Sequence, residues 1–433
     1  MYVRTHTHIY AWRAHTQVDY PLFRSGGEPT SEEIRMQLVL VTTNTTPKPL
    51  RAFVGTWNVG NAPPDEDLSS WLDPEEMDGA DIIAIGAQEC EFKTSSPDTS
   101  CQDEWIHALS LAIGDSHVLV RADSLGQMRL AIWAKMATVA GISAHSSDGV
   151  ATGIGNVMAN KGGVATAIWI WNTSVVFVNS HLAAHQNETK RRNMDYSNIV
   201  GGLELASHVA CDILQEFEHV VWMGDLNYRL DLPESVYGEG CNAKENPPAE
   251  LFSTIKTMVA QDQVSKLIEH DQLFNARIDM QQIDTCAARV RDGLVAFVGF
   301  RESDISFAPT FKVLRQAQTE YTTQRSPAYC DRVMWRSSPY LSVECTRYWS
   351  GECVASSDHK PVAAMLDLEH RYVYMCVCMC LIFVSHLIHV IGDTCMKCNI
   401  CMLLCIYAFV CVWMQAGAAT LVACGEPEAW LSQ

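Results

Sequence analysis

A carboxylate and an amide follow one apolar run almost directly. Asp225 and Asn227 come just after Val220–Met223, which is short, bulky and followed by glycine, as is typical of a buried strand. Alternate residues of an extended backbone face the same way, so we expect the two side chains to point together beyond the strand end. Asp225 could then take a proton from water, and Asn227 could hold that water in line. The alternative is a plain turn, because Gly, Asp and Asn are all turn formers.

Other polar residues occupy equivalent places at the start or end of further apolar runs. They are Asn58, Glu89, His181, Asp331, Asp358 and His359. Each alone has an ordinary explanation as a solvated carboxylate or a satisfied core or surface histidine. Together they supply carboxylates, an amide and imidazoles at strand ends, where the sites of sheet proteins gather. We therefore expect them to converge.

The residue types at these positions indicate a magnesium ion. Oxygen ligands without His/Cys clustering select Mg²⁺ over zinc, and Mg²⁺ uses one or two carboxylates while it keeps positions open for water and phosphate. Glu89 is the foremost ligand candidate. His359 and Asp331 are expected to form an oriented pair, in which the carboxylate favours an imidazolium that donates to a phosphoryl oxygen.

A further segment combines an amide, a cation and two glycines, in Asn160-Lys161-Gly162-Gly163. Glycines let backbone amides approach an anion, and Lys161 adds a point charge, so the segment is a candidate phosphate-binding loop. The alternative is a tight turn between two strands.

The elements that must position these residues lie between residues 49 and 368. Short apolar strands, such as those within 81–87, 164–171 and 175–180, are interspersed with helical stretches, which predicts an α/β domain with extensive sheet. One helix is expected from about Asn187 to Ala210, and another begins near Pro247 and Pro248. Residues 1–48 are polar and irregular and are predicted to be an extension or linker.

Charge and cysteine usage limit the class of protein. The formal net charge of −19 argues against a nucleic-acid binder, which needs a basic surface. Phosphate chemistry remains open, because a divalent cation supplies positive charge locally. The polar, His-rich opening does not resemble a secretory signal peptide, and eight scattered cysteines within 90–353 suit a reducing compartment. A cytoplasmic location is therefore expected.

The segment 369–433 is apolar and rich in cysteine. Residues 371–391 and 400–424 are each roughly long enough to span a bilayer, so a membrane hairpin is one interpretation. The same residue types are what simple TG and TA nucleotide repeats encode, so a repetitive stretch read as coding sequence is another. A packed appendage is the third.

With these residues assembled, the chain resembles the inositol polyphosphate 5-phosphatases. The matching runs fall in the family's order over about residues 50 to 367: FVGTWNVG, AIGAQE, NKGGVA, FVNSHLAAH, WMGDLNYRLD, FVGFRESDISFAPTFKV, SPAYCDRVMW and SSDHKPV. The resemblance implies a DNase I-like four-layer α/β sandwich, with two β-sheets packed face to face and helices outside. It also implies Mg²⁺-dependent removal of the 5-phosphate from phosphoinositides or soluble inositol polyphosphates.

The resemblance also implies a role for each matching residue. Metal binding falls to Glu89, with support from Asn58 and with Asp358 in the inner shell. The reacting groups are Asp225 as base, Asn227 as its partner in orienting water, His181 and His359 on the phosphoryl group, and Asp331 behind His359. Phosphate binding falls to Asn160 and Lys161, and recognition of a neighbouring 4-phosphate falls to Lys312 and Arg325.

Two departures from the family pattern affect the 4-phosphate region. Phe311 stands where the family often has a tyrosine, and Thr323 stands where it often has a lysine. The loss of a hydroxyl and a cation should weaken that contact, since a charge-assisted hydrogen bond contributes roughly 1.5–3 kcal/mol.

Two other functions remain as alternatives. One is a nuclease on the same fold, and the other is a catalytically inactive phosphoinositide-binding module. Lys161, Lys312 and Arg325 favour a compact polyanion over a duplex, and the presence of Glu89 and Asp225 argues against an inactive module. The expected partners are therefore an inositol lipid or a soluble inositol phosphate and a membrane surface, without nucleic acid, and no protein partner can be inferred.

Overall fold

The computed structural model describes a compact unit within Pro47–Arg371. The described residues are 48–153, 159–171, 173–205, 212–233, 249–277, 289–290 and 292–370. The predicted extension before residue 48 and the apolar segment after residue 370, with both candidate membrane spans, lie outside them. Within the described residues, no helix combines the length and apolar character needed to cross a bilayer.

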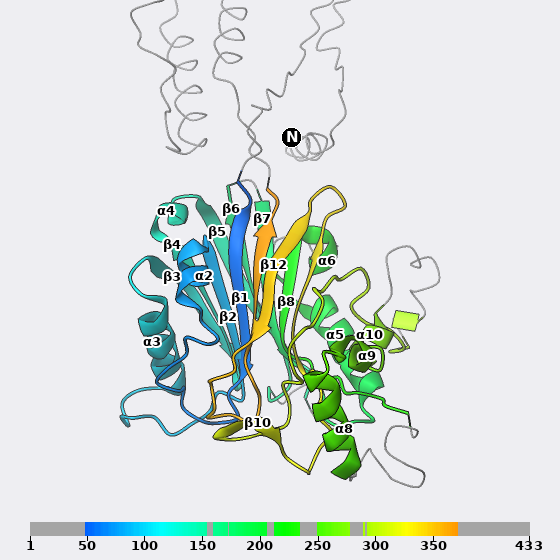
Figure 1. Ribbon diagram of the computed structural model, residues 1–433. Coiled ribbons are helices and arrows are strands. Elements are labelled where there is room, and N and C mark those ends of the chain that lie inside the picture. The colour runs from blue at the N-terminus through cyan, green and yellow to red at the C-terminus, as the bar shows by residue number, and fades with distance from the viewer. Residues whose placement is uncertain are drawn as a thin grey trace, which may run out of the picture. The chain divides into compact units, whose positions relative to one another are not determined.

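Two mixed β-sheets form the centre of this unit (Figure 1). The six-stranded sheet has the order β12 (Val343–Ser350), β13 (Val362–Leu368), β1 (Leu50–Asn58), β2 (Ile82–Gln88), β4 (Met128–Lys135), β3 (His117–Leu125). The five-stranded sheet has the order β11 (Asp331–Ser337), β8 (His219–Asp225), β7 (Thr173–His181), β6 (Gly162–Ile170), β5 (Ile142–Ala151). A small hairpin pairs β9 (Val313–Leu314) with β10 (Ala317–Tyr321).

Helices cover the outer faces of both sheets (Figure 1). On the outer face of the six-stranded sheet lie α2 (Pro74–Gly79) and α3 (Cys101–Ile113). On the outer face of the five-stranded sheet lie α5 (Thr189–Gly202), α6 (Ile213–Glu216) and α10 (Gln272–Ala276). The short helix α4 (Met136–Val139) and the helices α8 (Ala249–Ala260) and α9 (Val264–Ile268) instead pack against the apolar layer between the sheets. The order helix, sheet, sheet, helix is the predicted four-layer arrangement.

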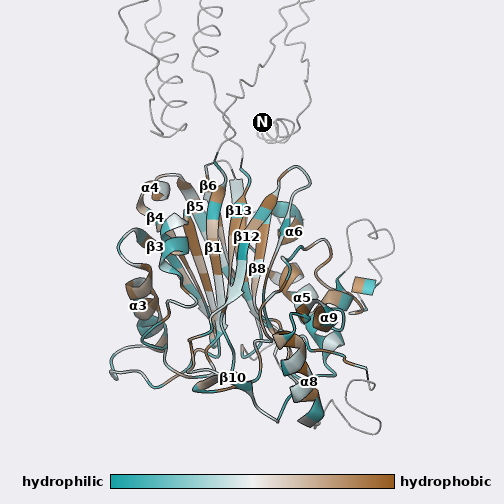
Figure 2. Cartoon of the chain, in the orientation of Figure 1, coloured by the Kyte–Doolittle hydropathy of each residue, from teal (hydrophilic) through white to brown (hydrophobic). Residues whose placement is uncertain are grey.

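β1 is apolar on both faces because apolar side chains cover it on both sides. Ala52 and Val54 face the apolar layer between the sheets, together with residues of β7 and β8. Phe53 and Trp57 alternate with them and face the outer cluster, where Trp57 packs against Trp105 of α3. A strand covered on both faces reads as a continuous apolar run, and the hydropathy colours are accordingly brown along much of the strands (Figure 2).

The helix expected from Asn187 to Ala210 is shorter than predicted. It runs from Thr189 to Gly202, and Leu203 follows in extended backbone with its side chain buried in the core. Two consecutive glycines at the end lower the helical propensity of the last turn, and burial of Leu203 sets the new direction. The start predicted near Pro247 lies outside the described residues, but α8 occupies the segment directly after it.

The topology brings the predicted strand ends to one edge. β1 runs parallel to β2 and antiparallel to β13, so the ends of β1 and β2 meet the start of β13. In the other sheet β8 pairs in parallel with β7 and antiparallel with β11, so Asp225 lies opposite both His181 and Asp331.

Candidate functional site

Asp225 lies at the centre of the converging residues. It is the last residue of β8 and is almost fully buried. Its Oδ2 accepts a hydrogen bond of 2.9 Å from Asn58 Nδ2, which comes from the other sheet. His181 Nε2 lies 3.2 Å and His359 Nε2 lies 3.9 Å from the same oxygen. Burial alone would raise the pKa of this carboxyl, but the charge on His359 and the hydrogen bond from His181 hold it well below its usual range.

A glycine makes this close arrangement possible. Gly224 has φ +144, and a Cβ atom there would lie 2.0 Å from the backbone oxygen of Ser180 on β7. Any side chain at this position would therefore push the ends of β7 and β8 apart. The glycine that ends the apolar run thus keeps His181 beside Asp225.

Asn227 does not face the site in the way that an extended backbone predicted. Its φ is +57, and its backbone N–H donates to Asp225 Oδ1 at 3.0 Å, so the chain turns here. Its side-chain amide donates to the carbonyl of Leu182 at 3.1 Å, and its side-chain oxygen accepts from Arg229 Nη2. The turn interpretation was correct for the backbone, and the water-orienting role of Asn227 stays a prediction.

His359 is held by a short chain of hydrogen bonds. Its Nδ1 lies 2.9 Å from Asp331 Oδ2, which also accepts from the Thr310 hydroxyl at 2.6 Å. The ring packs on Phe311 with 4.6 Å between centroids. Burial would lower the pKa of His359, but the nearby carboxylates, Asp331 first, raise it to about 9. His359 is therefore an imidazolium at neutral pH.

Glu89 and Lys161 lie beside His181 and form a second cluster with it. Glu89 directly follows β2 with φ +49, and its Oε1 lies 3.9 Å from His181 Nε2. Lys161, just before β6, contacts the same nitrogen with its Nζ. Burial, together with the Lys161 ammonium, lowers the pKa of His181, so this imidazole is neutral where His359 is charged. Glu89 and Asp225 thus meet around one histidine, as the convergence hypothesis requires.

The predicted phosphate-binding residues divide into two sets, and Lys161 and Lys312 form the set that contacts other site residues. Lys312 Nζ lies 3.1 Å from Asp358 Oδ2 and so adjoins the segment that carries His359. Asn160 and Arg325 are exposed, and no hydrogen bond or ion pair among the described residues links them to the other predicted site residues. Their roles stay predictions.

Sequence reasoning missed three residues that support the site. Thr310 holds Asp331, as described above. Arg229 donates to Asn227 and lies 4.4 Å above the Phe311 ring. Arg315 Nη2 donates to the carbonyl of Gly60 at 2.7 Å and lies 3.3 Å from Asp358 Oδ1. The available signal was their position two or three residues from predicted site residues, which alone does not distinguish them from surface residues.

The donor set fits an oxygen-preferring divalent cation. The Glu89 side chain is 37% exposed and its carboxylate accepts no hydrogen bond from the described residues, so it is free to bind a metal. Ligand atoms of Asp225, Asp331 and His359 also lie within 4.8 Å of one another. In that cluster Asp331 already forms a hydrogen bond with His359. Glu89, outside the cluster, and Asp225, within it, are the two carboxylates that lie next to His181 Nε2.

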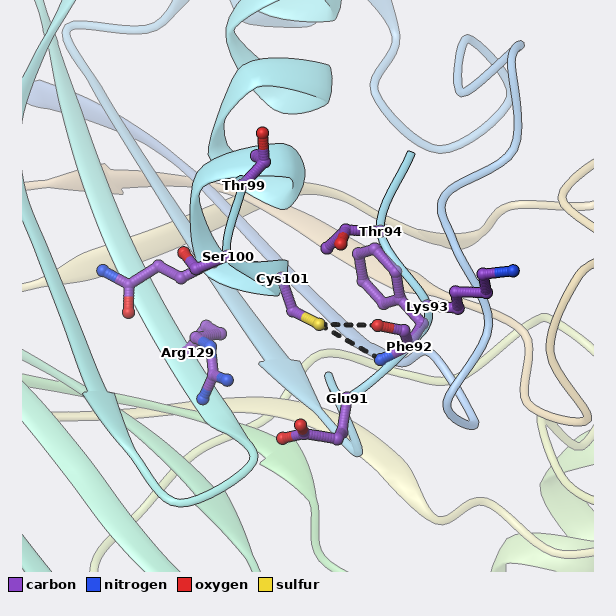
Figure 3. A pocket seen from close by; sticks show the side chains of 9 residues that line it. Glu91, Phe92, Lys93, Thr94, Thr99, Ser100, Cys101 and Arg129 are labelled. Atoms are coloured by element: carbon purple, nitrogen blue, oxygen red, sulfur yellow. Dashed lines mark hydrogen bonds between the residues drawn. The ribbon is translucent and has the colours of Figure 1, made fainter. Parts of the chain in front are cut away.

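A separate cavity lies beside the turn that follows Glu89 (Figure 3). It has a volume of about 480 Å³ and is lined by residues of the segment 91–94, the start of α3 and Arg129. Arg129 Nη2 donates to the carbonyl of Cys90 at 3.1 Å and so fixes the residue next to Glu89. None of the predicted site residues lines this cavity.

The matches to known proteins identify the family. Residues 55–365 match the family model described as Endonuclease/Exonuclease/phosphatase family 2. The chain belongs to the endonuclease/exonuclease/phosphatase family. The resemblance to its inositol polyphosphate 5-phosphatases is also confirmed by curated relatives. The chain is 33% identical over 346 residues to phosphatidylinositol 3,4,5-trisphosphate 5-phosphatase 1 from Homo sapiens, with 74% of this chain and 26% of the relative covered.

A second relative and a solved structure agree with this assignment. The chain is 31% identical to type II inositol 1,4,5-trisphosphate 5-phosphatase from Mus musculus, with 75% of this chain and 30% of the relative covered. It thus spans between a quarter and a third of the length of these relatives. The solved 5-phosphatase domain of SPsynaptojanin, in complex with inositol (1,4)-bisphosphate and calcium ion, has TM-score 0.57 and 27% identity, and covers 74% of this chain and 84% of that chain.

The fold prediction is confirmed by the same comparison, since the two mixed sheets and flanking helices match the DNase I-like fold of that domain. Cimex nitrophorin shares the fold with TM-score 0.54 at 18% identity, covering 75% of this chain and 100% of that chain. One fold therefore carries different chemistry, and function must be argued from the site.

Proposed function

We propose that this chain is a Mg²⁺-dependent phosphomonoesterase that removes the 5-phosphate from phosphoinositides or soluble inositol polyphosphates. The observation that carries the proposal is the meeting at Asp225 of a buried ionised carboxylate, the Asn58 amide from the opposite sheet and two histidines of different charge. The family and the named activities of the curated relatives support the substrate class.

Each side chain has one task in this proposal. Glu89 would hold the metal with support from Asn58 and Asp358. A bound Mg²⁺ would neutralise phosphate oxygens and make water easier to deprotonate. Asp225 accepts the proton of the attacking water, and its low pKa makes it a strong orienting acceptor but a weak base on its own. The His359 imidazolium donates to the phosphoryl oxygen, where negative charge accumulates.

Direct attack by water is supported by the state of Cys330. This thiol is fully buried, and burial raises its pKa, so it is not a thiolate at neutral pH. The nearby Arg332 is engaged by Asp271 at 2.9 Å and by Glu302 at 2.6 Å, so it is not presented to a phosphate. Both observations argue against a cysteine-phosphate route through this segment.

The test is phosphate release from 5-phosphorylated inositol lipids and soluble inositol phosphates, with Mg²⁺ and with EDTA. We expect release with Mg²⁺, its loss in EDTA, and a fall in kcat of roughly 10²–10⁴-fold for Asp225→Asn. Asp123→Asn is the matched control, because Asp123 accepts hydrogen bonds from Arg121, Ser147 and Thr166 away from the site. Turnover by Asp225→Asn at the wild-type rate would refute the proposal. Nicking of plasmid DNA without phosphate release would favour a nuclease instead.

We also propose that the protein is cytoplasmic and acts at a membrane surface, because an inositol lipid is one of the proposed substrates. A vesicle experiment concerns the second part, binding to a surface that carries such a lipid. Co-sedimentation with vesicles that contain phosphatidylinositol 4,5-bisphosphate, compared with vesicles of phosphatidylcholine alone, measures this. Equal partitioning into both kinds of vesicle, or into neither, would contradict it.

A further inference from the structure

The hairpin of β9 and β10 carries an arginine beside the proposed active site. The backbone of this hairpin is tied to the segment that contains Asp358: Val313 N–H donates to the Asp358 carbonyl at 2.9 Å, and Gln316 N–H donates to the Ala355 carbonyl at 3.0 Å. Arg315 lies between these two anchors, at the turn of the hairpin. Its place relative to Asp358 is therefore fixed by main-chain hydrogen bonds.

Two cations share one carboxylate at this point. Lys312 Nζ lies 3.1 Å from Asp358 Oδ2, and Arg315 Nη2 lies 3.3 Å from Asp358 Oδ1. One negative charge cannot balance two positive ones, so this corner has an excess positive charge while the centre of the site, around Asp225 and Glu89, is acidic. Such a corner attracts an anionic part of the ligand that is not the group bound at the metal.

The guanidinium of Arg315 has donors to spare. Nη2 makes both contacts described above, to Gly60 and to Asp358. Nε and Nη1 make no hydrogen bond with any residue that the structure describes, and the side chain is 46% exposed. A planar guanidinium with free donors binds phosphate in a bidentate manner.

The approach of Arg315 depends on the absence of a side chain at Gly60. Gly60 has φ +57, and a Cβ atom there would lie 2.6 Å from Arg315 Nη2 and 2.9 Å from Asp358 Oδ1. Gly60 comes two residues after Asn58, so this contact places Arg315 against the turn that carries a predicted support of the metal.

We propose that Arg315 is a phosphate-binding residue that selects substrates with a second phosphate next to the one that is hydrolysed. The inference rests on the proposed function and concerns the same site. Arg315 would act with Lys312 and would supply the cation that is missing at Thr323. The competing explanation is that Arg315 only clips the hairpin to the Gly60 turn.

Paired substrates separate the two explanations. Inositol 1,4,5-trisphosphate carries a phosphate next to the 5-phosphate, whereas inositol 1,5-bisphosphate has a hydroxyl there. We expect Arg315→Gln, which keeps an amide donor but loses the charge, to raise KM for the trisphosphate by about five- to tenfold, with little change for the bisphosphate. Arg315→Lys, which keeps the charge, should lie between the wild type and Arg315→Gln. Phosphatidylinositol 4,5-bisphosphate and phosphatidylinositol 5-phosphate in vesicles repeat the comparison for lipid substrates.

Arg347→Gln is the matched control. Arg347 is 43% exposed and pairs with Asp73 at 2.7 Å, so it resembles Arg315 in exposure and partner. Arg347 on β12 pairs with Met365 on β13, and Met365 pairs with Phe53 on β1. Phe53 lies about 16 Å from Asn58 along β1, so Arg347 is remote from the site. This variant should leave both KM values unchanged.

Two results would overturn the inference. One is an equal change of KM, or of kcat, for both substrates in Arg315→Gln, which indicates a clip. The other is no change for either. If the wild-type chain releases no phosphate, the proposed function fails, and titration calorimetry of the same two inositol phosphates still decides the role of Arg315. Weaker binding of the trisphosphate alone supports it, and equal binding by wild type and variant, or no binding by the wild type, refutes it.

Discussion

Replacement of Asp331 by Asn tests the charge on His359 most directly. Asp331 Oδ2 lies 2.9 Å from His359 Nδ1, and Asp331 is fully buried. An amide oxygen at this place still accepts from Nδ1–H and from Thr310, so the ring keeps its orientation. What disappears is the negative charge, which is the largest of the effects that raise the pKa of His359.

The expected loss can be worked out from the pKa. The pKa of His359 is raised from 6.5 to about 9, which corresponds to about 3 kcal/mol of preference for the imidazolium. Without Asp331 we expect the pKa to fall, and a return to the ordinary value of 6.5 sets the scale of the effect. The imidazolium fraction then falls about fourfold at pH 7 and about thirtyfold at pH 8. The activity ratio of wild type to Asp331→Asn should therefore grow with pH.

Two measurements check this reasoning. Nitrogen–proton NMR of metal-free protein follows the titration of His359, assigned by comparison with His359→Gln, and kcat/KM is measured from pH 6 to 9. Thr310→Ser keeps a hydroxyl beside the carboxylate and serves as the control, with an unchanged titration. A titration that stays near pH 9 in Asp331→Asn, or an activity ratio that is equal at pH 7 and pH 8, would refute the assigned cause.

Three further outcomes follow from the described contacts. Glu89→Gln should raise the Mg²⁺ concentration for half-maximal phosphate release by at least about tenfold without lowering the melting temperature, and an unchanged Mg²⁺ requirement would exclude Glu89 as ligand. Asn179→Leu should lose about 3 kcal/mol or more of stability in urea unfolding, because its buried amide donates to two backbone carbonyls and accepts from Gln88; a loss below about 1 kcal/mol would contradict this. Burial lowers the pKa of His219 to about 4, so the unfolded chain binds the extra proton first and stability falls as pH drops from 6.5 towards 4. His219→Gln should flatten that fall, and an identical slope would assign the effect to other groups.

The strand ends could be predicted because local sequence determines them. The apolar run of β8 stops where Gly224 and Asp225 follow, and the same change of polarity marks Asn58, Glu89 and His181. Parallel and antiparallel pairing then brings these ends to one edge. To predict at which end of a strand a polar residue lies, only the length of the apolar run before it is needed.

The direction of Asn227 could not be predicted in this way. The Asp225 carboxylate accepts a hydrogen bond from the backbone N–H of Asn227, and Arg229 donates one to the side-chain oxygen of Asn227. These local hydrogen bonds turn the backbone away from the extended conformation. Arg315 was missed for a different reason. Its partner Gly60 is 255 residues away in the sequence, and neither segment carries a sequence signal that predicts contact with the other.

The hydrogen bond between Asn58 and Asp225 joins the two sheets at the point where the reaction is proposed to occur. Asn58 belongs to one sheet and Asp225 to the other, and the apolar layer between them fixes how far one sheet can slide over its partner. Substitutions of interior residues such as Ile132 or Phe177, remote from any phosphate, would therefore change the alignment of amide and carboxylate. The apolar layer between the sheets therefore sets the distance between the reacting groups. We expect variants with altered interior residues to lose turnover before they lose their fold.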